Sequence, residues 1–209
     1  MVPPGKASPL PELPCAPGSG PFHIKGLSYR GLARHIDATI GLDRFCEALD
    51  GPLGVFVRQP FLASGRYDIF PFYPLMRALA DFRGARFDDF VRASTAAQAR
   101  YDAEHVYKII LDVDSPDSIA SRVSRFNSQI YDFGEYNAHQ PAPKHAVTDF
   151  DHIPAFLAPW FGPMHAAYAQ ESLRIGGGKD VVIVSQKTRD AGTREGYALV
   201  SFRTEYRWR

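Results

Sequence analysis

Residues 197–208 read YALVSFRTEYRW and give the clearest structural signal in the chain. The even positions are mostly apolar, whereas Ser201, Arg203, Glu205 and Arg207 at odd positions are polar. The apolar set is Ala198, Val200, Phe202, Tyr206 and Trp208. Alternation with a period of two predicts a half-buried antiparallel strand. We expect the apolar side of this strand to pack against the preceding helices.

The sequence before this strand predicts the rest of a small sheet. Val181–Val184 is a short apolar run typical of a buried strand. Gln129–Tyr136 and about Lys144–Phe150 predict a hairpin. A helix is expected to start at Pro163 and to end at Gly176-Gly177-Gly178, because glycine adopts the left-handed conformation that ends helices.

The first half of the chain, from Phe22 onward, predicts mainly helices, since apolar residues recur there at helical spacing. These helices are expected around residues 32–40, 42–49, 74–82, 87–101, 106–110 and 115–127. Tyr101 is expected on the buried face of its helix, and Val55–Arg58 is expected as a short β-like run. The sequence therefore predicts an α+β fold in which an N-terminal helical half packs on a C-terminal antiparallel sheet of about four strands, with one intervening helix.

The N-terminal segment differs in composition from the rest of the chain. Residues 1–21 hold seven prolines with glycine and serine between them, and proline opposes both helix and sheet. We interpret this segment as a flexible tail and residues 22–209 as a single domain, a size typical of one hydrophobic core. The alternative is a polyproline-II segment that docks to another protein.

Charge and composition exclude several classes of protein. The formal net charge of +1 gives no general attraction to nucleic acid or to an anionic membrane. Cys15 and Cys46 are the two cysteines, which argues against a disulfide framework or a cysteine-rich zinc site. No apolar run predicts a signal peptide or a membrane span, so we expect a cytoplasmic protein.

Histidines and carboxylates gather in the second half of the chain. His139, His145, His152 and His165 accompany Asp149 and Asp151, and these residue types can bind zinc or iron. Their spacing does not place two ligands on one element, because a strand would turn Asp149 and Asp151 away from His152. We therefore expect no metal. If the chain is an enzyme, His152 and His165 are its candidate acid–base residues.

Aromatic residues are the more informative feature. The 15 phenylalanines and 10 tyrosines could line an apolar site, with hydroxyl groups to orient a bound molecule. We select Tyr107, Tyr131 and Tyr168 as ligand-binding candidates because each lies on an element expected to face the core. His165 lies about one helical turn before Tyr168 and joins them.

Several short landmarks occur in an order known from one superfamily. They are Lys25-Gly26, Gly41, Tyr73-Pro74, Tyr107, Tyr131-Asp132-Phe133-Gly134, and a glycine-terminated helix that runs into Lys179-Asp180-Val181. In this order the chain resembles the superfamily of haem-nitric-oxide-binding domains, 4-vinyl-reductase-type domains and TRAPP small subunits. Within it, the chain is most similar to an uncharacterised family found largely in myxobacteria. The resemblance implies a cavity between helices and a curved sheet, which relatives use for haem, small aromatic effectors or an acyl chain.

The sequence departs from the haem branch of this superfamily. That branch carries a proximal histidine on the helix after the tyrosine-bearing one, whereas the helix at 115–127 has Arg122, Ser124 and Arg125 and no histidine. The cysteine zinc cluster of the aromatic-sensing relatives is missing too. We therefore expect no cofactor.

These observations lead to three hypotheses. The first is a non-enzymatic ligand-binding or sensory module that holds a small apolar or aromatic molecule between helices and sheet. The second is an enzyme that acts on a hydrophobic biosynthetic intermediate through His152 or His165. The third is a TRAPP-like adaptor that binds a protein partner or forms a homodimer.

Overall fold

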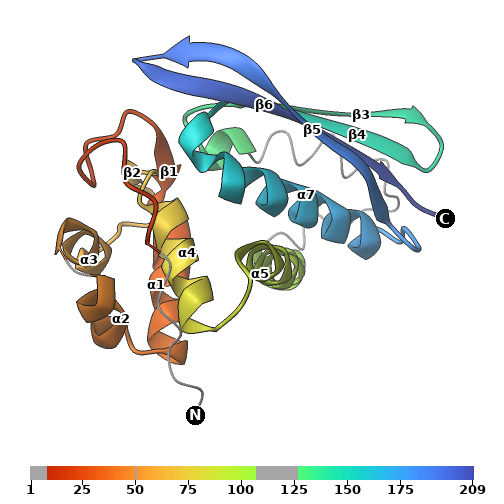
Figure 1. The fold of residues 1–209 in the computed structure, drawn as a ribbon. Coiled ribbons are helices and arrows are strands. Elements are labelled where there is room, and N and C mark those ends of the chain that lie inside the picture. The colour runs from red at the N-terminus through yellow and green to blue at the C-terminus, as the bar shows by residue number, and fades with distance from the viewer. Residues whose placement is uncertain (1–8, 50, 107–126) are drawn as a thin grey trace. The chain divides into compact units, whose positions relative to one another are not determined.

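The computed structural model describes residues 9–49, 51–106 and 127–209, apart from the side chains of His105 and Val106. It has the predicted α+β fold, with N-terminal helices, a four-stranded antiparallel sheet, and one helix between the strands in sequence (Figure 1). The chain divides into two compact units. Unit 1 contains the described residues up to Phe87 and returns for Ile130–Asp132, and unit 2 contains the others. The expected division into a tail and one domain stays a prediction.

Unit 1 is built from helices and a short two-stranded sheet. Its elements are β1 (His23–Lys25), α1 (Gly26–Thr39), α2 (Leu42–Leu49), α3 (Gly51–Arg58), β2 (Arg66–Asp68) and α4 (Phe72–Phe82). β1 pairs antiparallel with β2. The core is rich in aromatic and aliphatic side chains, including Phe22, Tyr29, Ile36, Phe45, Phe70, Leu75 and Leu79.

The expected β-like run at Val55–Arg58 is wrong, because these residues end helix α3. The spacing of Leu53, Phe56 and Val57 puts all three on one buried face, while Val55 is 72% exposed. Pro52 lies in the first turn, where a helix tolerates a residue without an N–H. Helical packing therefore overrides the strand preference of the two valines.

Unit 2 contains the sheet. Its elements are α5 (Phe87–Tyr101, whose first residue belongs to unit 1), a π-helical turn (Asp102–Val106), β3 (Glu135–Ala142), β4 (His145–Pro154), a 3-10 turn (Ala155–Leu157), α7 (Ala158–Ile175), β5 (Val182–Arg194) and β6 (Tyr197–Arg207). The strands pair in the order β3-β4-β6-β5, with β6 and β4 in the centre. α7 runs along one face of the sheet (Figure 1).

The first hairpin lies later in the chain than predicted. β3 begins at Glu135 rather than at Gln129, because residues 127–130 are helical and Tyr131 forms only an isolated bridge with Ile24. Gly134 then turns the chain at a φ of +75°, a backbone conformation that glycine adopts at low cost. Two residues connect β3 to β4.

Two further boundaries differ from the predictions. α7 begins at Ala158 rather than at Pro163, and Pro163 lies inside the helix. β5 is a long edge strand rather than a short buried one, and Val182 and Val184 are about half exposed. Tyr101 is also exposed, since α5 buries Val91, Thr95 and Ala99.

β6 is the strand predicted from residues 197–208. Phe202, Tyr206 and Trp208 are buried, as the alternation requires. Toward the start of the strand the alternation fails, because Leu199 and Ser201 are buried and Ala198 is exposed. The pairing register shifts here on both sides, opposite β4 and opposite β5, which changes the side chains that face the core. No helix within the described ranges is long and apolar enough to cross a membrane.

Candidate binding site on the inner face of the sheet

We call the side of the unit 2 sheet that α7 covers its inner face. The strand register arranges its side chains in three adjacent rows. The first row contains Tyr136, Phe150, Phe202 and Thr188. The second contains Ala138, Thr148, Thr204 and Gln186, and the third contains Ala146, Tyr206 and Ile183. Two mainly aromatic or aliphatic rows therefore lie on either side of a more polar one.

Gly162 allows α7 to approach this face closely. A Cβ atom at this position would lie 2.9 Å from Cε1 of Phe202, closer than real side chains approach one another. The Gly162 carbonyl also accepts a hydrogen bond of 2.9 Å from Nε2 of Gln186 on β5. The helix is thus anchored to the sheet at its N-terminal half.

His165 lies on α7 within a cluster of aromatic rings. Its ring centroid is 4.3 Å from that of Phe161 and 4.4 Å from that of Phe150. Tyr136 lies farther away, at 6.4 Å. Phe150 and Phe161 meet edge to face at 4.9 Å, a favoured arrangement for aromatic pairs. An imidazole is therefore held against hydrocarbon on two sides.

This environment keeps His165 uncharged. Its Nε2 atom has no contact with solvent, and burial lowers the pKa of the side chain to about 3. A neutral imidazole has one donor and one acceptor nitrogen, so it can bind an uncharged polar group. It is a weak base at neutral pH, which bears against an acid–base role for this residue.

Tyr168 lies about one turn farther along α7. Its hydroxyl takes part in a set of hydrogen bonds that also includes Gln98 of α5. It donates a hydrogen bond of 3.1 Å to Oδ2 of Asp102, while Nε2 of Gln98 donates one of 2.6 Å to Oδ1. Desolvation raises the pKa of the Asp102 carboxyl, and these two hydrogen bonds lower it in part. The predicted need of Tyr168 for a polar partner is met by Asp102.

A second buried carboxylate lies on α7. Glu171 accepts hydrogen bonds from Arg100 at 2.6 Å and from Arg174 at 3.1 Å. Both arginine side chains are about half exposed. The buried charge of Glu171 is therefore compensated, and this group joins α5 to α7 within unit 2.

Tyr131 and His152 belong to other parts of the chain. Tyr131 is buried in unit 1, where it bridges to Ile24, and burial raises its pKa. His152 is exposed on β4 at a φ of 60°. Tyr107 lies outside the described residues. Of the predicted residues, His165 and Tyr168 share one helix and one unit.

The expected group of histidines and carboxylates has a different arrangement from a metal site. Asp149 is paired with Arg203 and Asp151 with Arg189, both on the sheet. Among the residues that the structure describes, no three histidine, cysteine or carboxylate side chains are close enough to bind a metal ion.

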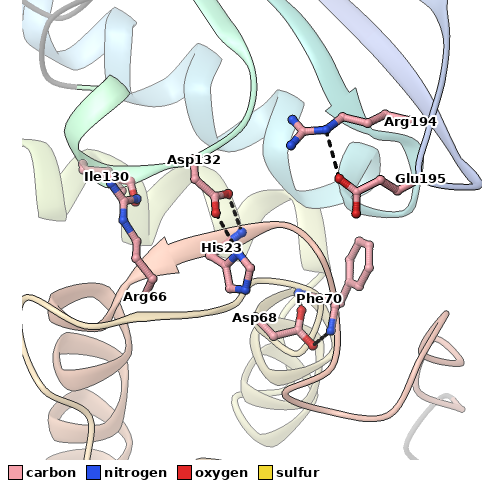
Figure 2. A network of polar contacts seen from close by, with 9 residues as sticks. His23, Arg66, Asp68, Phe70, Ile130, Asp132, Arg194 and Glu195 are labelled. Atoms are coloured by element: carbon pink, nitrogen blue, oxygen red, sulfur yellow. Dashed lines mark hydrogen bonds and ion pairs between the residues drawn. The ribbon is translucent and has the colours of Figure 1, made fainter.

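Unit 1 contains a polar network that the sequence did not reveal (Figure 2). Asp68 is 2% exposed, and its carboxylate accepts hydrogen bonds from the backbone N–H groups of Gly18, Gly20 and Phe70 at 2.9–3.1 Å. Desolvation raises its pKa, and these backbone hydrogen bonds lower it. Gly18 and Gly20 belong to the segment expected as a tail, so its last residues make defined contacts.

The same network holds the returning segment of unit 1 (Figure 2). Asp132 accepts hydrogen bonds from the backbone N–H of His23 at 2.7 Å and binds Nδ1 of its imidazole at 2.6 Å. Arg66 donates to the carbonyl of Ile130 at 2.7 Å. His23 and Asp132 are 109 positions apart, and no local spacing in the sequence links them.

Comparison with solved structures places this architecture among H-NOX-like folds. The chain matches the Fe(II) unliganded H-NOX protein from K. algicida with a TM-score of 0.57 and 10% identity, covering 89% of this chain and 98% of that one. It matches an H-NOX mutant from T. tengcongensis with a TM-score of 0.58 and 8% identity, covering 89% and 98%. It matches a mutant of Tt H-NOX with a TM-score of 0.62 and 8% identity, and the match covers 89% of this chain and 95% of that one. No protein-family model matches the sequence, and no curated protein does.

Because other H-NOX-like structures concern haem, the described histidines can be tested as haem ligands. An axial ligand must present an imidazole nitrogen to an open plane, whereas the ring of His165 is enclosed by Phe150 and Phe161. His23 is bound to Asp132, and His145 faces Glu205 at 3.7 Å. His35, His139 and His152 are exposed. None of these six histidine side chains therefore has the surroundings of an axial ligand.

Proposed function

We propose that the chain is a small-molecule-binding module of the sensory kind, which holds an apolar or aromatic molecule on the inner face of the unit 2 sheet. The observation that carries this proposal is the neutral imidazole of His165 between aromatic rings, one turn from Tyr168. Aromatic walls with a few placed polar groups are typical of small-molecule sites. The H-NOX-like fold supports the same class of function by analogy alone.

Within this proposal the residues have separate roles. Phe150 and Phe161 provide apolar surface, and His165 lies between them as an uncharged imidazole. Tyr168 is oriented by Asp102, which fixes the position of its hydroxyl. Haem is not part of this proposal, since the histidine side chains that the structure describes lack the geometry of an axial ligand. We also propose that the chain belongs to the uncharacterised family found largely in myxobacteria.

The test is native mass spectrometry of the full chain purified from its source host. We expect a retained small molecule on the wild-type chain, and its loss when His165→Leu and Tyr168→Phe are combined. His152→Gln, an exposed change in the same unit, is the matched control and should retain the molecule. A bare wild-type chain, or equal retention by the double variant, would contradict the proposal.

The absorption spectrum of the same sample gives a second readout. We expect no Soret band, and a Soret band that survives purification would contradict the exclusion of haem. A specific homodimer without any bound molecule would favour the adaptor hypothesis.

A further inference from the structure

The inner face contains one polar atom that packing does not explain. Tyr206 on β6 has no exposed surface, and its hydroxyl forms no hydrogen bond with any residue in the described part of the chain. A buried hydroxyl without a partner costs free energy, and proteins rarely leave one in that state without a reason. Burial raises the pKa of Tyr206 to about 12, so the hydroxyl keeps its proton and is a donor at neutral pH.

Two threonines provide the hydroxyls around Tyr206. Thr148 and Thr204 face each other across β4 and β6, in the row next to Tyr206. Both hydroxyls are close enough to lower the pKa of Tyr206, although neither meets it with hydrogen-bond geometry. Thr204 is 4% exposed. Within this polar row Gln186 bonds to α7, and the two threonine hydroxyls lie beside Tyr206.

The surroundings of these hydroxyls are apolar. The ring of Tyr206 packs in one buried cluster with Leu173, Val181 and Trp208, and Ala169 of α7 packs against it. The aromatic row with Phe150 and Phe202 lies on the other side of the threonines. An elongated apolar molecule on this face would therefore meet hydroxyls near its middle.

The charges near the hydroxyls are compensated. Arg92 of α5 is close enough to lower the pKa of Tyr206, and its guanidinium is bonded to Asp88 at 2.9 Å. Among the residues that the structure describes, Arg92 is the one charged side chain that contributes to the pKa of Tyr206. This environment favours an uncharged ligand group over a carboxylate or an ammonium.

We propose that Tyr206, together with Thr148 and Thr204, is a hydroxyl subsite that donates a hydrogen bond to an uncharged acceptor, such as a carbonyl or ether oxygen, on the bound molecule. This inference rests on the proposed function, because it assumes that a molecule occupies the inner face. It adds the chemical class of that molecule: mainly apolar, with a neutral oxygen acceptor. A pure hydrocarbon would leave the Tyr206 hydroxyl without a partner.

The experiment compares two probes of similar size on the full chain, acetophenone with a carbonyl and ethylbenzene without one, by saturation-transfer NMR titration. We expect the wild-type chain to bind acetophenone about tenfold more tightly than ethylbenzene, the effect of one hydrogen bond to an otherwise unpaired group. Tyr206→Phe removes the hydroxyl and keeps the ring. This change should weaken acetophenone binding about tenfold and leave ethylbenzene binding unchanged.

Tyr29→Phe is the matched control. Tyr29 is also fully buried but lies in unit 1, where its hydroxyl donates to the Asp68 carbonyl at 2.6 Å. It should leave both affinities unchanged. Thr204→Val, which replaces a hydroxyl by a methyl group of similar size, is a second site variant and should reduce the acetophenone preference. Thermal unfolding of each variant shows that it is folded.

The outcomes separate the two proposals. If neither probe binds the folded wild-type chain, the proposed function and the subsite both fail. If both probes bind and Tyr206→Phe alters neither affinity, or alters both equally, the subsite is overturned while the proposed function stands.

Discussion

Tyr29 in unit 1 and Tyr206 in unit 2 are both fully buried, but their hydroxyls differ. Tyr29 stacks on Phe61 and donates a hydrogen bond to the Asp68 carbonyl, so its polar atom helps to hold the fold. Tyr206 packs in an apolar cluster beside two threonines, and its hydroxyl has no hydrogen bond within the described residues. The Tyr29 hydroxyl therefore contributes to the structure of unit 1, whereas the Tyr206 hydroxyl is the group that we propose for binding another molecule.

The largest effect is expected at the centre of the unit 1 network. Asp68→Ala removes the acceptor of three backbone N–H groups, and we expect a loss of about 3 kcal/mol in the free energy of unfolding. Urea unfolding followed by circular dichroism measures it. Asp132→Ala, at a more exposed carboxylate, should cost less. Equal effects of the two changes would mean that burial does not distinguish these carboxylates.

A pair of glycines compares the packing of the two units. Gly162→Ala would press a Cβ against Phe202, and we expect it to cost about 2 kcal/mol. Gly31→Ala in α1 meets no atom within 4 Å, and it should stabilise its helix by up to about 1 kcal/mol. Thermal unfolding measures both. A stable Gly162→Ala variant would show that α7 can move off the sheet at little cost.

Burial of His165 should make the stability of the fold depend on pH. Because its pKa falls from 6.5 in the unfolded chain to about 3 in the fold, the unfolded chain binds more protons between these values. Stability should therefore fall as the pH drops below 6.5, with a contribution from this residue of about 1.4 kcal/mol per pH unit. Urea midpoints of wild type and His165→Gln, measured from pH 7.5 to 5, test this. Parallel curves would contradict the burial of the imidazole.

The smallest effects on the free energy of unfolding are expected from changes to the two tyrosines. Tyr29→Phe loses a buried hydrogen bond and should cost about 1 kcal/mol of unfolding free energy. Tyr206→Phe removes a hydroxyl without a hydrogen bond, so it should be neutral or slightly stabilising in the absence of a bound molecule. Denaturant unfolding of both variants gives the comparison. A clear loss of stability in Tyr206→Phe would indicate that its hydroxyl has a structural partner.

The sequence predicted the fold class because its strongest signals come from helices and strands that bury one face and expose the other. The alternation at β6 and the glycines after α7 both reflect local backbone requirements. Predictions failed where tertiary packing decides: Val55–Arg58 is helical because of its buried face, and β5 is exposed because it lies at a sheet edge. Local patterns contain neither kind of information.

The candidate site was predictable only in part. His165 and Tyr168 are one helical turn apart, so their shared face follows from spacing alone. The importance of Tyr206 depends on strand pairing, which brings Thr148 of β4 opposite Thr204, two residues before Tyr206 on β6. The pairing of His23 with Asp132 likewise depends on a return of the chain to unit 1. A single sequence does not specify such long-range partners.

Hydrogen–deuterium exchange of the full chain with and without saturating acetophenone tests most directly whether unit 2 holds the bound molecule. We predict slower exchange in peptides from α7 and β6, with no change in peptides from α1. Slower exchange confined to unit 1, or no change anywhere at saturation, would contradict the assignment of the site to the inner face of the sheet.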